Sequence, residues 1–147
     1  MLAARGDKTW RYLPTAFVMA QIDNNNLTIL VVDDDEDLRL LVTQMLRSEG
    51  YSVIGAANGT EAQQLALQHV PDLILMDIGL PGVDGLTTIW KMREEAELVD
   101  VPIIVLSAYD SYDLRGEAAS AGCQGYLTKP LEVVELTGMV KRILAKS

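Results

Sequence analysis

The sequence predicts an α/β protein with an open, doubly wound sheet of five parallel strands, on the basis of three observations. Five short apolar runs alternate with five stretches that repeat apolar residues at helical spacing. Four of the runs are rich in Val, Ile and Leu on both faces, which is typical of parallel strands covered by helices on both sides. The chain has 147 residues, too few for a closed barrel of eight strand–helix units, which needs about 250 residues.

The expected strands and helices alternate along the chain. The expected strands are the apolar runs Leu27–Val32, Tyr51–Gly55, Leu73–Met76, Ile103–Leu106 and Gly125–Leu127. The expected helices carry apolar stripes within residues 38–46, 62–66, 86–93, 114–121 and 133–144. Asn58 and Asp84 stand where helix N-caps belong. Gly50 and Gly122 follow helices, at positions where a left-handed backbone favours glycine.

The composition excludes several classes of function. A formal net charge of −9, from 21 acidic and 12 basic side chains, disfavours nucleic acid as a partner, because its binding draws on clustered Lys and Arg. The chain has one cysteine, Cys123, and one histidine, His69, which excludes an intramolecular disulfide and a zinc site of several Cys and His residues. No stretch approaches the ~18 apolar residues of a membrane span. We therefore expect a cytoplasmic protein that binds neither nucleic acid nor membrane.

The chain divides into an opening segment and one domain. Residues 1–26 show no sustained periodicity, and we expect them to be a flexible N-terminal tail or extension. Their apolar stretch Ala16–Ala20 is too short for the core of a signal peptide, which takes about 7–15 residues. Residues 27–147 are expected to form the whole α/β domain, which leaves no room for a second, output domain.

Polar residues that can carry chemistry stand at the ends of the expected strands. Asp33 and Asp34 end the first strand, Asp77 the third and Ser107 the fourth, and Lys129 follows the fifth. Sites in doubly wound sheets form beyond the carboxyl ends of the strands, so we expect these side chains to converge. Three carboxylates at close range repel one another unless a cation lies among them. Oxygen ligands suit Mg²⁺, and the lack of His and Cys in this set argues against zinc.

This set of side chains fits phosphoryl transfer. Asp77 is the best nucleophile, because a carboxylate can form an aspartyl-phosphate and this one ends the central strand. Lys129 and a Mg²⁺ ion held by Asp34 would neutralise the phosphoryl oxygens, and Ser107 would donate a hydrogen bond to one of them. The other acids of the run belong at the start of the first helix, where the helix dipole favours them: Asp35, Glu36 and Asp37.

Four blocks of the sequence carry a family resemblance: Leu30–Asp34, Pro71–Gly85, Ile104–Ala108 and Gly125–Pro130. Together they resemble the receiver domain of bacterial response regulators of the CheY type, used in two-component signalling. The blocks stand in order and at the expected spacing, and the match covers about residues 27–146, so it is far more specific than any single block. The resemblance implies a flavodoxin-like strand order 2-1-3-4-5 and a stand-alone receiver.

The resemblance implies a role for each residue of the site. Asp77 would accept a phosphoryl group from a phosphohistidine on a sensor histidine kinase or a histidine phosphotransfer protein. Asp33, Asp34, Asp77 and the backbone carbonyl of Gly79 would hold Mg²⁺, or Mn²⁺ as a substitute, with Asp33 acting through water. Lys129 would supply a positive charge to the phosphoryl group.

The resemblance also implies a switch and an output surface. Ser107 and Tyr126 match the family's switch pair, in which the hydroxyl moves toward the phosphoryl group and the aromatic ring turns inward. The fourth helix, fifth strand and fifth helix would bind a downstream protein, with the chain acting as a monomer or as a phosphorylation-dependent dimer. The Lys129–Pro130 bond would be cis, which is inexpensive only before proline. Gly79 and Tyr109 stand where the family tunes the lifetime of the phosphorylated form.

Other functions stay open on the sequence alone. An interaction module of this fold that is never phosphorylated predicts a missing acid or lysine, whereas the set here is complete. A phosphorelay intermediate would pass its phosphoryl group onward. A phosphatase would place a second acid two residues after the nucleophile, where this chain has Gly79, and a flavin-binding module would need a phosphate-cradling loop where this chain has acids. We expect a self-modifying phosphoacceptor that also loses its phosphate by its own hydrolysis, and not a turnover enzyme.

Overall fold

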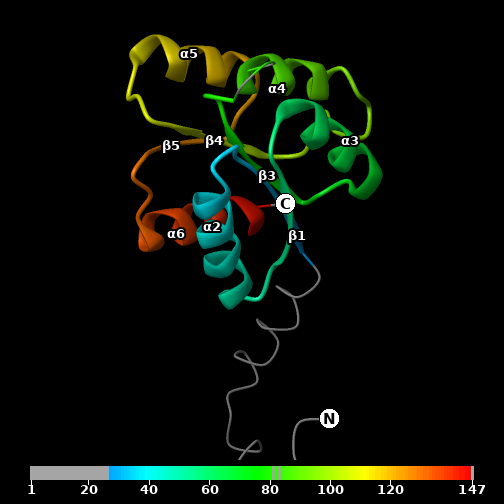
Figure 1. The fold of residues 1–147 in the computed structure, drawn as a ribbon. Coiled ribbons are helices and arrows are strands. Elements are labelled where there is room, and N and C mark those ends of the chain that lie inside the picture. Colours follow the sequence, from blue (N-terminus) through cyan, green and yellow to red (C-terminus); the bar gives the residue numbers. More distant parts are fainter. Residues whose placement is uncertain (1–26, 81, 83, 147) are drawn as a thin grey trace, which may run out of the picture.

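The computed structural model describes residues 27–80, 82 and 84–146, so the predicted tail at 1–26 lies outside the described residues. Five strands and five helices alternate along the described chain, in the predicted order (Figure 1). The strands are β1 (Thr28–Val32), β2 (Ser52–Ala56), β3 (Leu73–Asp77), β4 (Ile103–Ser107) and β5 (Gly125–Thr128). The helices are α2 (Glu36–Ser48), α3 (Gly59–His69), α4 (Gly85–Arg93), α5 (Tyr112–Ser120) and α6 (Val133–Leu144). None of these described helices is long and apolar enough to cross a membrane.

All neighbouring strands are parallel, and their order across the sheet is β2-β1-β3-β4-β5. The predicted fold class and strand order are therefore confirmed. The chain winds from β1 to β2 in one direction and then returns past β1 to β3, so β1 and β3 flank the point where the winding reverses. Val32 of β1 lies opposite Met76 of β3. The next residues, Asp33 and Asp77, are therefore delivered to the same edge of the sheet.

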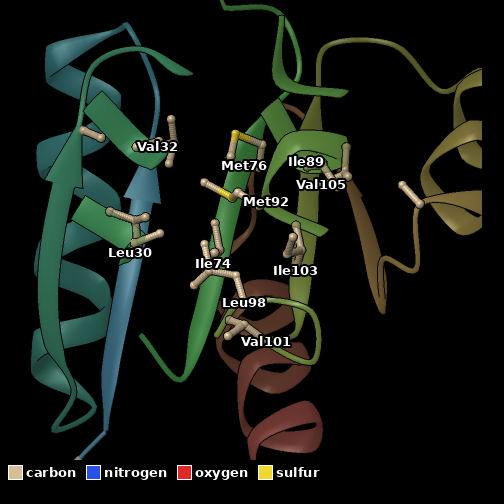
Figure 2. Close-up of a cluster of buried hydrophobic side chains, with 14 of the residues drawn as sticks. Leu30, Val32, Ile74, Met76, Ile89, Met92, Leu98, Val101, Ile103 and Val105 are labelled. Carbon is tan, nitrogen blue, oxygen red and sulfur yellow. The ribbon is translucent and has the colours of Figure 1, made fainter. Parts of the chain in front are cut away.

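A helical layer covers each face of the sheet, with α3, α4 and α5 on one face and α2 and α6 on the other (Figure 1). Alternate residues of the central strands enter two separate cores, because successive side chains of a strand point to opposite faces. Leu30 and Val32 pack with α3, α4 and α5, whereas Ile29 and Val31 pack with α2 and α6. Figure 2 shows the first core, where strand residues meet α4 and the loop after it: Leu30, Val32, Ile74, Met76, Ile103, Val105, Ile89, Met92, Leu98 and Val101.

Burial differs between the central strands and the edge strands. Every residue of β3 and β4 is buried, which explains why their sequences are apolar on both faces. β2 and β5 lie at the two edges of the sheet and keep partly exposed positions. The central strands therefore form a rigid support, and their polar terminal residues Asp77 and Ser107 belong to the strands themselves.

The residues at the helix ends are largely those that the sequence predicts. The side chains of Asn58 and Asp84 cap α3 and α4, each accepting a backbone N–H at 2.8 Å. Gly50 and Gly122 adopt left-handed backbones with φ of 97° and 78°. One described residue with positive φ is not a glycine: Val70, with φ of 42°, ends α3 directly before a proline. No sequence pattern indicates this conformation at a valine.

Gly85, the first residue of α4, lets this helix begin against the backbone at the end of β3. A Cβ added there would collide with the Asp77 carbonyl oxygen and would lie 2.6 Å from Ile78 Cα, and neither backbone atom can move aside easily. We predict that Gly85→Ala lowers the free energy of unfolding by about 1–3 kcal/mol in urea titrations. The matched control is Gly116→Ala in α5, whose Cβ would meet nothing within 4 Å. It should raise that free energy by about 0.5–1 kcal/mol, and equal effects of the two changes would contradict the close approach.

Candidate functional site

The strand-end residues predicted from the sequence meet in one cavity at the carboxyl edge of the sheet. The cavity has a volume of about 640 Å³. It is lined by all five predicted side chains and by the residues two positions after Asp77 and Ser107: Asp33, Asp34, Asp77, Ser107, Lys129, Gly79 and Tyr109. The parallel topology therefore brings together groups that lie far apart in the sequence.

The Lys129 ammonium lies between two carboxylates from different strands. Its Nζ donates to Asp33 Oδ2 at 3.1 Å and to Asp77 Oδ2 at 3.0 Å. Its backbone N–H donates to the Ser107 carbonyl oxygen at 2.7 Å. The Lys129–Pro130 bond that follows is cis, as the family resemblance implies. One residue after β5 thus connects the ends of β1, β3 and β4.

Burial sets the electrostatics of this cluster. Asp33 is 1% exposed and Asp77 is 5% exposed. Burial raises the pKa of Asp33, although hydrogen bonds from the Asp35 N–H and from Lys129 favour its charged form. Burial alone would lower the pKa of Lys129, but its hydrogen bonds to Asp77 and Asp33 outweigh burial and raise that pKa. The ammonium is therefore firmly charged beside the two carboxylates.

A third carboxylate leaves the cluster short of positive charge. Asp34 is exposed, and one oxygen each from Asp33, Asp34 and Asp77 lies within 4.8 Å of the others. One ammonium cannot balance three carboxylates, so the cluster favours a further cation. An all-oxygen donor set suits Mg²⁺ or Mn²⁺, which bind carboxylates together with water. The residues present therefore fit the predicted divalent ion.

Gly79 lies directly beside the Asp77 carboxylate. Its N–H donates to Asp77 Oδ1 at 2.8 Å, while Lys129 donates to the other oxygen. A Cβ built at Gly79 would lie 3.5 Å from Asp77 Oδ1, which is ordinary contact, so glycine leaves this side of the Asp77 carboxylate more open than any other residue would. The Gly79 carbonyl as a metal ligand stays a prediction, as do the chemical roles of the other site residues.

The predicted switch pair is connected through Tyr109. The buried Ser107 accepts a hydrogen bond at Oγ from the Tyr109 N–H at 3.0 Å. The Tyr126 hydroxyl, which comes from β5, donates to the Tyr109 carbonyl oxygen at 2.7 Å. The two predicted residues therefore lie on either side of one peptide segment.

Two contacts near the site involve arginines that no sequence pattern singles out. Arg39 of α2 donates from Nη1 to the Asp33 carbonyl oxygen at 2.7 Å. The Arg115 guanidinium of α5 lies 4.5 Å from the centroid of the Tyr126 ring. Both arginines lie at helix positions where a charged residue is ordinarily exposed to solvent, so their spacing in the sequence does not predict these contacts.

The remaining acids of the run lie at the start of α2 as predicted, with the first as its N-cap: Asp35, Glu36 and Asp37.

The chain is similar in sequence to known proteins. Residues 29–141 match the family described as the response regulator receiver domain. The chain is 36% identical over 119 residues to the DNA-binding dual master transcriptional regulator RpaA of Synechocystis sp., covering 81% of this chain and 49% of that protein. It is 33% identical over 119 residues to sporulation initiation phosphotransferase F of Bacillus subtilis, covering 81% of this chain and 94% of that protein. The chain spans about half the length of several of its curated relatives.

The fold also matches a solved structure. The chemotaxis protein CheY4 of Vibrio cholerae superimposes with a TM-score of 0.77 and 29% sequence identity, covering 80% of this chain and 98% of that one. The similarity in structure and sequence extends over the domain that holds the acidic cavity.

Lys129→Met removes the positive charge shared by Asp33 and Asp77 and keeps a side chain of similar length. Two buried carboxylates would then face each other, and removing one partner of a buried ion pair costs about 3–5 kcal/mol. We predict a loss of this size in the free energy of unfolding at neutral pH without divalent cations, measured by urea titration. Lys91→Met, at an exposed position of α4, is the matched control. If the two variants lost equal stability, the ammonium would not be holding the cluster together.

Proposed function

The chain belongs to the response regulator receiver domain family, and we propose that its Asp77 accepts a phosphoryl group from a phosphohistidine. The donor is a sensor histidine kinase or a histidine phosphotransfer protein. The observation that carries the proposal is the buried Asp77 carboxylate, whose two oxygens accept hydrogen bonds from the Gly79 N–H and the Lys129 ammonium. The acceptor is thus fixed in orientation and has positive charge beside it.

The proposed reaction moves one phosphoryl group between two side chains. An Asp77 carboxylate oxygen attacks the phosphorus and forms an O–P bond, while the N–P bond of the phosphohistidine breaks and the imidazole leaves with the bonding electron pair. Lys129 has three N–H donors, so it can contact a phosphoryl oxygen while one donor stays on Asp33. Ser107 can donate as well, because its Oγ already accepts from a backbone N–H and its own proton can point into the cavity.

Asp33, Asp34, Asp77 and the Gly79 carbonyl would hold the divalent cation. When bound, Mg²⁺ supplies positive charge that offsets the carboxylates and the oxygens of the arriving phosphoryl group. The clustering of the three carboxylate oxygens within 4.8 Å supports this part of the proposal. Phosphorylation is accordingly Mg²⁺-dependent, and Mn²⁺ can take its place.

Phosphorylation adds negative charge and acceptor oxygens next to Ser107. In the proposed switch, the Ser107 hydroxyl moves toward the phosphoryl group and Tyr126 follows, which alters the surface formed by α5, β5 and α6. That surface binds a downstream protein in the cytoplasm, with the chain as a monomer or a phosphorylation-dependent dimer. The chain modifies itself, loses its phosphate by its own hydrolysis and is not a turnover enzyme. Gly79 and Tyr109, which both line the cavity, set the rate of that loss.

One comparison favours a second role, that of a phosphorelay intermediate. The relative named sporulation initiation phosphotransferase F is matched over 94% of its length. In this role Asp77 would pass its phosphoryl group to a histidine of a second protein instead of switching a target. Following labelled phosphate from the phosphorylated chain to histidine phosphotransfer proteins separates the two roles, because only the intermediate transfers its label.

We predict that acetyl phosphate with Mg²⁺ adds one phosphoryl group to the chain, measured as a mass increase of the intact protein. Asp77→Asn should abolish the adduct, because an amide is not a nucleophile for forming the acyl phosphate. Asp37→Asn is the matched control, since this exposed acid lies in the first turn of α2, and it should be phosphorylated like the wild type. Removal of Mg²⁺ by a chelator should prevent the reaction.

Two results would contradict this proposal. An adduct that persists in Asp77→Asn would show that another residue is the acceptor, and a wild-type chain that takes up no phosphate would exclude the phosphoacceptor role. Hydrolysis of a chromogenic phosphate monoester at enzyme-like rates would instead indicate a phosphatase.

A further inference from the structure

Arg115 covers the aromatic ring of Tyr126, across the junction between α5 and β5. Its guanidinium carbon lies 4.5 Å from the ring centroid, which is within the range of a cation–π interaction. Its Nε also donates to Asp110 Oδ1 at 2.7 Å. Asp110, in the loop that leads into α5, therefore holds the guanidinium by an ion pair while the guanidinium contacts the Tyr126 ring on β5.

Two hydrogen bonds continue from this ring to the candidate site. The Tyr126 hydroxyl donates to the Tyr109 carbonyl oxygen at 2.7 Å. The N–H of Tyr109 donates to Ser107 Oγ at 3.0 Å. Tyr109 is therefore tied to the ring on one side and to the serine hydroxyl on the other. A movement of the Tyr126 ring can therefore change the position of the Ser107 hydroxyl, which lines the cavity.

We propose that Arg115 is a positioning residue for phosphoryl transfer. By holding the Tyr126 ring in the unphosphorylated chain, it keeps Tyr109 in place, and Tyr109 keeps the Ser107 hydroxyl oriented to donate to the arriving phosphoryl oxygen. The movement of Ser107 and Tyr126 in the proposed switch follows that step. The chemistry at Ser107 rests on the proposed function, whereas the contacts that link Arg115 to Ser107 are independent of it. Arg115 does not touch the reacting atoms and acts only through these three residues.

α5 itself buries little of its surface against the rest of the fold. Ala118 is the one residue of α5 that is buried, and β5 is an edge strand. Tyr126 is partly buried and packs against the core beneath α3, α4 and α5. Because the Tyr126 ring is only partly buried and lies on an edge strand, we expect a cation over its face to affect its position.

Arg115 also connects the surface of α5 with the cavity. Its side chain is 47% exposed, so a protein that binds α5 can reach the guanidinium.

Arg115→Gln tests the inference, with Arg115→Lys as the conservative variant and Arg142→Gln, an exposed arginine on α6, as the matched control. The first measurement is amide hydrogen exchange at Tyr109, whose N–H is protected by its bond to Ser107. An exposed cation–π contact predicts exchange about two- to fivefold faster in Arg115→Gln. Arg115→Lys should restore part of the protection, and Arg142→Gln should match the wild type. The rate of phosphorylation by acetyl phosphate should fall in Arg115→Gln by a similar factor.

A double variant tests whether Arg115 acts through Tyr126. Tyr126→Phe keeps the ring but removes the hydrogen bond to Tyr109. Adding Arg115→Gln to Tyr126→Phe should then cause no further loss in the phosphorylation rate, because the route is already broken. A fully additive loss would show that the arginine acts by another route and would overturn the inference.

Unchanged exchange at Tyr109 in Arg115→Gln would also overturn the inference, even if the wild type is phosphorylated normally. This failure is distinct from failure of the proposed function, in which the wild-type chain takes up no phosphoryl group. In that case the amide exchange still decides whether Arg115 positions Ser107.

Discussion

The ammonium of Lys129, shared by Asp33 and Asp77, is the interaction on which the rest of the site depends. Its nitrogen lies 3.1 and 3.0 Å from oxygens of two carboxylates that come from different strands and are almost fully buried. Buried carboxylates are strongly unfavourable without a charged partner, and here one partner serves both. With Asp34 at the rim, the cluster still carries more negative than positive charge. That imbalance makes the cavity receptive to a divalent cation and, once the cation is present, to a phosphoryl group.

The fold places the Asp77 carboxylate at the end of a fully buried strand, whereas the segment that contacts the Ser107 hydroxyl is less buried. β3 and β4 are buried along their whole length, and each places one polar residue, Asp77 or Ser107, at its carboxyl end. Gly85 lets α4 begin against the backbone beneath the acceptor. The contacts that reach Ser107 come instead from the loop before α5, and α5 itself buries only Ala118. A fixed carboxylate beside an adjustable hydroxyl is consistent with the proposed phosphorylation switch.

Most of the fold and of the candidate site could be predicted from the sequence, because the periodicity of apolar residues indicates which faces of the strands and helices are buried. It located the five strands and five helices, and strand-end residues such as Asp33 and Lys129 followed from the parallel topology. The strand order came from family resemblance, since several orders of five parallel strands bury the same residues. Contacts that depend on side-chain direction could not be predicted: no spacing relates Arg115 to Tyr126, which meet only because α5 lies beside β5. The left-handed backbone of Val70 likewise could not be predicted, because valine is not a residue type that favours this conformation.

Calorimetric titration with Mg²⁺ tests the charge imbalance most directly. Asp34 belongs to the carboxylate cluster, and within the described residues no hydrogen bond or ion pair holds its side chain. Asp34→Asn therefore removes one charge without breaking a side-chain hydrogen bond or ion pair to another described residue. The account predicts saturable Mg²⁺ binding to the wild type, strongly weakened binding to Asp34→Asn, and wild-type binding to Asp37→Asn, whose exposed acid lies outside the cluster. Undiminished binding to Asp34→Asn, or no binding to the wild type, would contradict it.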